Sequence, residues 1–420
     1  MLRLRMGSPS CEDVRVATLI STDEARRRVL ASVEALTAEP VALEAALGRV
    51  VAEDVHSRSD MPPFDSSAMD GFAVGPGEEG ELAIAGESRA GSPSADRLRP
   101  GLAMAISTGA AVPEGASAVV PVERAEVSEH AVRVPATPEG DNIRRRGEAL
   151  RHGDVLLRRG AQLGPAAVGV LASAGLSEVL CARRPRVAIL ATGDELVPPG
   201  QALEPGQIWS SNPLALAGQV TLAGGETVSS ETVADDPGAT RSALDQALES
   251  ADVVCVSGGV SVGPHDHVKG ALAHLGVSES FWGVALKPGK PTWFGTLERG
   301  GRTVLAYGLP GNPVSAMVTF QLFVRPALRA LQGADPGAAR TTAVLDEPVR
   351  RVLTREHAVR CVLRSAQDGL HVYPTGPQGS HVLSSMSAAE ALAMIAAGEG
   401  TANAGERVPV ELLTGVWCPR

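Results

Sequence analysis

Aromatic side chains, long apolar runs and excess positive charge are all scarce in this sequence of 420 residues. Phe, Trp and Tyr together make up only 3% of it, so the hydrophobic cores must be built from Ala, Val and Leu. No apolar run reaches the roughly 18 residues that a membrane-spanning helix needs, which excludes such a helix. The formal net charge of −10 excludes a non-specific binder of nucleic acid or of anionic membranes, because both surfaces would repel the chain. Any site for an anion must therefore be local.

The cysteines are few and lack the spacing of a zinc site or a disulfide framework. There are five, and none forms a C-x-x-C pair: Cys11, Cys181, Cys255, Cys361 and Cys418. We therefore expect free thiols, which fit a reducing compartment. The N-terminal segment lacks the apolar block of a signal peptide. These features predict a cytoplasmic protein in which residues 1–16 form a loose tail.

Several domains are expected, because the chain exceeds the length that one hydrophobic core usually organises. Residues 21–36 begin with capping residues and carry apolar side chains at helical spacing, which predicts a helix. A second, shorter helix is predicted over 41–47. Residues 75–150 are rich in Gly, Pro and short alternating runs, which favour small strands, and 164–175 is helical again. We predict a segmented helical domain, with an inserted and mostly β domain between its parts; the boundaries are 17–60 plus 150–184, and 61–149.

The pattern between residues 185 and 334 is strand, loop and helix, repeated three times. Three apolar runs predict buried parallel strands: Arg186–Ala191, Asp252–Val256 and Thr303–Ala306. Three pairs predict helix starts with a capping side chain before a proline: Asn212-Pro213, Asp236-Pro237 and Asn312-Pro313. A central three-layer α/β domain follows from this alternation. After Pro336 the short alternating stretches return, and we predict a C-terminal β-barrel over 339–420.

Three unusual loops follow these strands, at 191–200, 257–267 and 308–316. In an open parallel sheet, ligands bind beyond the carboxyl ends of the strands. Backbone amides at Gly258, Gly259 and Gly263, together with a helix start, are suited to holding phosphate. The second loop lacks the Gly-Lys-Ser/Thr ending of a Walker A motif. One such loop alone could be an ordinary glycine-rich turn after a strand, whereas three together favour a site for a phosphorylated ligand.

Five carboxylates lie at the same predicted edge of the sheet: Asp194, Glu195, Asp235, Asp236 and Asp266. Mg²⁺ prefers one or two carboxylates together with water and substrate phosphate, so several of these could hold it. Asp194 and Asp236 could instead cap helices, above all Asp236, which precedes a proline. The predicted metal ligands are therefore Glu195, Asp235 and Asp266.

Basic residues gather in two segments, NIRRRGEALR at 142–151 and KPGKP at 287–291. Three adjacent arginines in an acidic protein suit an anionic ligand, although a solvated loop would also account for them. Lys287 and Lys290 flank a Pro-Gly turn that favours contact with a ligand, and a plain surface turn is the alternative. His265 and His267 flank Asp266 without a third ligand, so no zinc site is predicted.

Eight strings, in order along nearly the whole chain, resemble the molybdopterin molybdenumtransferase family, the MoeA-like enzymes that include the C-terminal region of gephyrin. They are PPFDSSAMDGFAV, STGAAVPEGASAVVPVE, NIRRRGE, ATGDEL, SGGVSVGPHD, KPGKP, GLPGNPVSA and GSHVLSSMS. The resemblance implies the four domains described above and a homodimer. It also implies that adenylated molybdopterin and molybdate are the substrates, that hydrolysis of the adenylate depends on Mg²⁺, and that AMP is released.

The resemblance also implies which residues form the site, in a cleft between the central domain of one subunit and the inserted domain of the other. The inserted domain would supply Asp70, Thr108, Arg144, Arg145 and Arg146. The central domain would supply Glu195, Asp235, Gly258, Gly259, Ser261, Gly263, Asp266, Lys287, Lys290, Pro310, Gly311 and Pro313. The C-terminal domain would supply Arg360 and Ser380. Within this set, Asp70, Thr108, Glu195, Asp235, Asp266 and Lys287 are the expected catalytic residues.

Two positions depart from the family pattern. Ala149 stands where the family often has Asp, and Gly283 stands where some members carry Lys. These departures bear on how metal or molybdate is handled. Two alternatives stay open: the preceding adenylyl transfer to molybdopterin, and a non-catalytic scaffold that grips a partner, as gephyrin does. The expected partners are the molybdopterin adenylyltransferase and apo-molybdoenzymes.

Overall fold

The structure is a computed structural model that describes residues 19–259, 267–337 and 339–413. The chain forms two compact units. The small unit is Glu39–Cys181, and the large unit combines Met1–Ala38 with Ala182–Arg420. The four predicted domain boundaries are finer than this division and stay predictions. Within the described ranges, no helix is long and apolar enough to cross a membrane.

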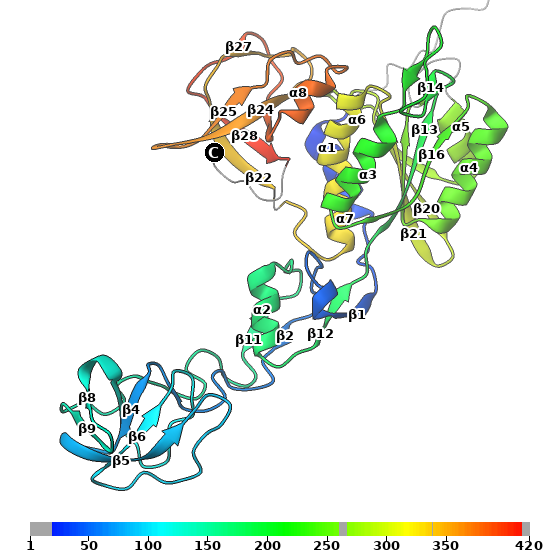
Figure 1. Ribbon diagram of the computed structural model, residues 1–420. Coiled ribbons are helices and arrows are strands. Elements are labelled where there is room, and N and C mark those ends of the chain that lie inside the picture. Colours follow the sequence, from blue (N-terminus) through cyan, green and yellow to red (C-terminus); the bar gives the residue numbers. More distant parts are fainter. Residues whose placement is uncertain (1–18, 260–266, 338, 414–420) are drawn as a thin grey trace, which may run out of the picture. The chain divides into compact units, whose positions relative to one another are not determined.

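A six-stranded sheet forms the centre of the large unit (Figure 1). Its strands, in spatial order, are β16 (Glu226–Val233), β13 (Arg186–Thr192), β17 (Val253–Ser257), β21 (Arg302–Leu309), β20 (Trp293–Arg299) and β18 (Ser278–Trp282). The first four are parallel, and β20 runs antiparallel to both of its neighbours, β21 and β18. This confirms the three predicted strands. β16 was missed because its Thr, Ser and Glu side chains form no apolar run.

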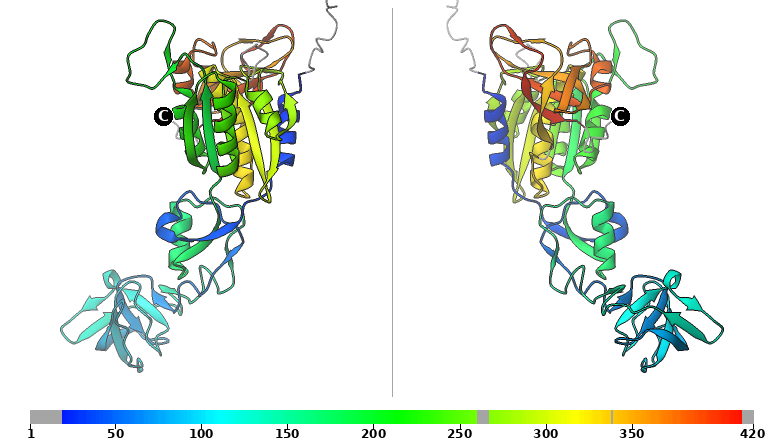
Figure 2. Two further views of the ribbon diagram at one scale, coloured as in Figure 1. Left: turned by 90° about the vertical axis from the view of Figure 1, so that its right-hand side faces the viewer. Right: turned by 90° about the vertical axis from the view of Figure 1, so that its left-hand side faces the viewer.

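Helices cover both faces of this sheet, so the side chains of β13 alternate between two cores. Val187 and Ile189 pack with α1 (Thr22–Ala31), α3 (Asn212–Leu222), α6 (Pro313–Thr319) and α7 (Arg325–Leu331). Ala188 and Leu190 pack with α4 (Pro237–Ser250) and α5 (His267–His274). A π-helical turn, η3 (Phe320–Val324), joins α6 to α7, and α1 lies beside it (Figure 2). The predicted helix starts at 212, 236 and 312 are confirmed.

A closed barrel completes the large unit. Its ring of strands is β24 (Glu356–Ala366), β25 (Gly369–Pro374), β22 (Arg340–Leu345), β28 (Arg407–Leu412) and β26 (Ala391–Ile395), with β26 pairing back to β24. The remaining elements are β23 (Val349–Arg350), β27 (Thr401–Ala402) and α8 (Leu383–Ser387). One strand of the preceding domain, β19 (Leu286–Lys287), pairs in parallel with β24. Two short strands, β14 (Leu196–Val197) and β15 (Ile208–Trp209), pair in parallel beside the central sheet.

The small unit contains the inserted β domain. Its sheet has the order β7 (Ala118–Pro121), β4 (Gly71–Val74), β6 (Leu102–Ile106), β5 (Gly80–Ser88), β9 (Ala131–Val134) and β8 (Glu126–Val127). A 3-10 turn, η2 (Val122–Arg124), follows β7, and β3 (Ser66–Ser67) pairs with β10 (Ile143–Arg144). The segments on either side contribute β1 (Ala38–Ala42) with β12 (Glu178–Ala182), β2 (Val55–His56) with β11 (Val155–Leu157), and α2 (Pro165–Ser173).

Two helix predictions need correction. The segment 41–47 forms the end of β1 and a single 3-10 turn, η1 (Leu43–Ala45), rather than a helix. Val41 and Leu43 pack into a small core with α2, and pairing of β1 with β12 outweighs the local helical spacing. The first helix ends at Ala31 instead of continuing to Leu36.

Candidate functional site

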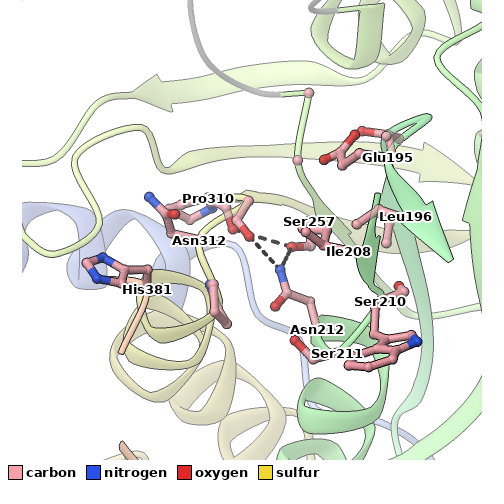
Figure 3. Close-up of a pocket in the computed structure, with 18 of the residues that line it drawn as sticks. Glu195, Leu196, Ile208, Ser210, Ser211, Asn212, Ser257, Pro310, Asn312 and His381 are labelled. Atoms are coloured by element: carbon pink, nitrogen blue, oxygen red, sulfur yellow. Dashed lines mark hydrogen bonds between the residues drawn. The ribbon is translucent and has the colours of Figure 1, made fainter. Parts of the chain in front are cut away.

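The loops after three parallel strands meet at a cavity of about 760 Å³ in the large unit (Figure 3). Residues after β13, after β17 and after β21 all line it, because the carboxyl ends of parallel strands lie at one edge of the sheet. The lining includes the predicted residues Glu195, Asp235, Gly258, Gly259, Pro310, Gly311 and Pro313. These predicted residues therefore meet at one cavity at this edge of the sheet, and their role there stays a prediction.

The side chain of Asn212 joins these loops. Its Nδ2 donates to Ser257 Oγ at 2.8 Å and to the Gly311 carbonyl at 2.7 Å. Ser257 Oγ in turn donates to the Pro310 carbonyl at 3.3 Å, and Figure 3 shows this network at the floor of the cavity. The prediction that Asn212 caps its helix is wrong, since Ser211 is the N-cap residue of α3; Asn312 does occupy the N-cap position of α6, although its side chain makes no cap bond. Asn212 instead fixes the spacing between two strand ends.

Gly258 and Gly259 are required by close packing. A Cβ on Gly258 would lie 2.8 Å from the Thr192 carbonyl oxygen, and one on Gly259 would lie 2.6 Å from Val268 Cγ2. Both residues have positive φ, which favours glycine. The amide of Gly258 donates to the Leu309 carbonyl at 3.1 Å, so it is not available to phosphate as the sequence suggested. The predicted residues Ser261, Gly263 and Asp266 lie outside the described residues.

Two of the three predicted metal ligands face the same cavity. Glu195 and Asp235 are exposed carboxylates that line it, and neither forms an ion pair within the described part of the chain. Asp194 has a supporting role, since its Oδ1 accepts the Asp235 N–H at 3.0 Å. Asp236 caps α4 by accepting the Ala239 N–H at 2.7 Å, as predicted. Asp236 thus caps a helix, Asp194 holds the backbone of a neighbouring loop, and Glu195 and Asp235 line the cavity.

Arg360, a predicted site residue, lies in the barrel and is not among the residues that line the cavity. Arg360 is fully buried on β24, and burial lowers the pKa of its guanidinium. Its Nη2 donates to the carbonyls of Pro377 and Gly379, both at 3.2 Å, while Nε and Nη1 have no partner among the described residues. The next residue, Ser380, accepts the Val314 N–H with its carbonyl at 3.2 Å. Arg360 therefore anchors a barrel segment that reaches the start of α6.

The small unit brings together two further predicted residues. Asp70 accepts the Thr108 N–H at 2.7 Å. The three arginines differ: Arg145 pairs with Asp65 at 2.7 Å and Arg146 with Asp60 at 2.6 Å, while exposed Arg144 has no acidic partner in the described ranges. Arg145 and Arg146 thus also hold their own loop, and Arg144 is the guanidinium left unpaired.

Comparison with known proteins agrees with this geometry over most of the chain. Three family descriptions match: "MoeA N-terminal region (domain I and II)" at residues 20–175, "Probable molybdopterin binding domain" at 188–330 and "MoeA C-terminal region (domain IV)" at 342–413. The molybdopterin molybdenumtransferase of Haemophilus influenzae is 36% identical over 402 residues, which cover 94% of this chain and 98% of that protein. The chain belongs to the molybdopterin molybdenumtransferase family.

Other members of the family show the same extent of similarity. Molybdopterin molybdenumtransferase 2 of Mycobacterium tuberculosis is 37% identical over 388 residues, covering 89% of this chain and 94% of that protein. A solved structure of the molybdopterin biosynthesis MoeA protein of Pyrococcus horikoshii superposes with a TM-score of 0.78 at 29% identity, covering 95% of this chain and all of that one. The multidomain α/β and β architecture is therefore that of the family.

The family-implied lysines lie beside the cavity rather than in its described lining. Lys287 is half-buried on β19, paired in register with His357 of β24. Burial lowers the pKa of His357 to about 4, and the charges of Lys287 and Arg360 add to this effect. Lys290 is exposed, and its carbonyl accepts the Val284 N–H at 3.0 Å. The neighbouring Pro291 does line the cavity.

Several cavity residues were not selected from the sequence. His381 lines the cavity and lies across it from Ile208 in Figure 3. It belongs to the string GSHVLSSMS, from which the family resemblance implies only Ser380 as a site residue. Trp209 and Asn212 belong to the string IWSSN, which ends at the first residue of α3 and carries no catalytic pattern of its own. Asn212 could be assigned only from the fold, because its partners lie 45 and 99 residues away in the sequence.

The cysteine prediction holds for the three cysteines that the structure describes. Cys181, Cys255 and Cys361 are free and buried. Burial raises the pKa of the Cys361 thiol to about 12, so this thiol stays protonated at neutral pH. None of the three is placed to act as a nucleophile at the cavity, since none lines it.

Proposed function

We propose that this chain inserts molybdenum from molybdate into molybdopterin, acting on the adenylated form and releasing AMP. The curated relatives named molybdopterin molybdenumtransferase support the transfer itself. The observation that carries the site assignment is the pair Glu195 and Asp235, which face one cavity built on glycine loops at the sheet edge. Such an edge suits an adenylate, because backbone groups there can approach a phosphate closely.

Mg²⁺ is the proposed cofactor, and two carboxylates that line the cavity support it, although the described residues contain no group of three possible ligands. Glu195 and Asp235 supply carboxylate oxygens that form no ion pair with any described residue, the hard ligands that Mg²⁺ prefers, and Asp266 is the proposed third ligand. When bound, the ion would neutralise charge on the phosphoanhydride. Asp194 orients the Asp235 backbone, and Gly193 leaves room for the Glu195 carboxylate, whose Oε2 lies 2.5 Å from where a Cβ would stand. The chain thus holds both carboxylates toward the cavity in advance.

The molybdate end of the site is proposed at Arg360, Ser380 and Lys287. A buried guanidinium with two unpartnered nitrogens is costly, because desolvated donors without acceptors lose their bonds to water. An oxyanion would satisfy these donors. Lys287 adds positive charge nearby, as its effect on the pKa of His357 indicates. Lys290, on the exposed side of the same turn, would attract the anion.

A cytoplasmic homodimer is also proposed, in which the inserted domain of one subunit completes the site of the other with Asp70, Thr108 and Arg144–Arg146. Exposed apolar helix faces support an assembly. Leu214 and Leu222 on α3 are 66% and 76% exposed, and Val170 on α2 is exposed among small residues. Contacts with the adenylyltransferase and with apo-molybdoenzymes are proposed as well, for delivery of substrate and product.

The decisive experiment is AMP release from adenylated molybdopterin on addition of molybdate and Mg²⁺. We expect Glu195→Ala, Asp235→Ala and Asp266→Ala to lower turnover strongly. Glu231→Ala is the matched control, because Glu231 is an exposed carboxylate of the same domain that does not line the cavity. An adenylyltransferase or a scaffold would release no AMP. Turnover that survives all three changes would overturn the site assignment.

A further inference from the structure

One aromatic side chain in the cavity is exposed without a structural reason. The sequence has four Trp, two Tyr and six Phe, and among those described only Phe64 and Trp209 are exposed. Trp209 is 54% exposed, and the adjacent Ile208 is exposed to the same extent. Both line the cavity. Exposing a large indole to water is unfavourable, so this position indicates a group that covers it.

The position of Trp209 is fixed by its neighbours. Its strand β15 pairs with β14, with Val197 opposite Trp209. The Ile208 N–H donates to the Glu195 carbonyl and the Ser210 N–H to the Val197 carbonyl, both at 2.8 Å. The indole Nε1–H donates to the Gln201 carbonyl at 2.9 Å. The only polar group of the ring is therefore used within the protein, and the ring is held beside the strand that follows Glu195.

We propose that Trp209 and Ile208 form a platform on which a flat nitrogen heterocycle of the substrate stacks. This rests on the proposed function, in which the substrate carries two such groups, adenine and pterin, on either side of its phosphates. Stacking suits an indole whose N–H is already satisfied, since the face of the ring then interacts without hydrogen bonding. Trp209 thus acts in positioning and affinity, next to the carboxylates proposed to hold Mg²⁺.

The test is calorimetric binding of three small probes to the full-length chain, without molybdate or Mg²⁺. AMP carries adenine, 6-hydroxymethylpterin carries the pterin, and ribose 5-phosphate carries neither base. We expect Trp209→Ala to weaken binding of AMP or of the pterin by about 5- to 150-fold, and Trp209→Phe to weaken it less. Ribose 5-phosphate should bind all variants equally. The probe that responds identifies which heterocycle stacks.

Controls separate this role from folding and assembly. Trp282→Phe is the matched control, because Trp282 is half-buried under Lys269 and does not line the cavity. Equal affinity of wild type and Trp209→Ala for both base-bearing probes would overturn the proposal. A change in assembly state, seen as a change in the sedimentation coefficient of Trp209→Ala, would also overturn it if that change explains the loss of affinity. If the probes show stacking but no AMP is released in the turnover assay, the proposed function is rejected, whereas the stacking role of Trp209 is retained.

Discussion

The amide of Asn212 lies 2.8 Å from Ser257 Oγ, and this bond ties the first residue of α3 to the last residue of β17. The same nitrogen reaches the Gly311 carbonyl, beyond the end of β21. One side chain therefore holds together three loops that form the floor of the cavity. The consequence is that the shape of the cavity depends on a residue that need not contact the reacting atoms.

We predict that Asn212→Ala lowers both stability and substrate affinity. Removal of two hydrogen bonds from a partly buried site should cost about 1–3 kcal/mol in the free energy of unfolding. Asn212→Asp should be no better, because a carboxylate cannot donate to the Gly311 carbonyl. Urea unfolding and the KM for adenylated molybdopterin measure the two effects. Asn403→Ala, an exposed position, is the control, and an equal response of both alanine variants would refute this role.

Gly258→Ala is expected to be more damaging than an alanine at Gly270. The new Cβ at 258 would meet backbone at 2.8 Å with φ at +97°, whereas nothing lies within 4 Å of a Cβ at 270, inside α5. We expect the first change to destabilise by about 1–3 kcal/mol and the second to stabilise by up to about 1 kcal/mol. Thermal unfolding of both variants tests this contrast. A stable Gly258→Ala protein would contradict the packing described.

Arg360→Lys should raise the KM for molybdate by about tenfold or more while changing the KM for the adenylated substrate much less. A lysine keeps the positive charge but loses the fork of donors that suits an oxyanion. Arg364→Lys is the control on the same strand, since Arg364 is exposed and lies over the ring of Tyr373, whereas Arg360 is buried. Steady-state kinetics with each substrate varied in turn separate the two constants. Parallel changes in both would count against an oxyanion site.

His357 should make the protein sensitive to acid. Its folded-state pKa of about 4 is below the ordinary 6.5, because burial and then the charge of Lys287 disfavour the protonated ring. The unfolded chain therefore binds the proton more readily, and stability falls as the pH drops from about 6.5 to 4, by roughly 3 kcal/mol. His357→Gln should remove this part of the slope. Denaturation midpoints at pH 7 and 4.5 measure it, and identical slopes would contradict the assignment.

Local patterns in the sequence were sufficient for the elements whose environment is uniform. The apolar runs of β13, β17 and β21 predict buried parallel strands because both faces of each strand are covered. The cap at Asp236 depends only on residues of its own turn. The meeting of Glu195 and Asp235 at one rim follows from parallel topology, since the ends of such strands share an edge.

Tertiary structure alone decided which side chains are free and which are held. Asn212 has the local features of a helix cap, yet its partners lie 45 and 99 residues away. Arg145 and Arg146 pair with acids about 80 residues distant, whereas Arg144 has no acidic partner among the residues that the structure describes, although the three are equivalent in the sequence. Arg360 is buried because the barrel closes around β24. Periodicity and capping rules depend on residues only a few positions apart. The hydrogen bonds and ion pairs of Asn212, Arg145 and Arg146 depend instead on which distant segments the hydrophobic core brings together.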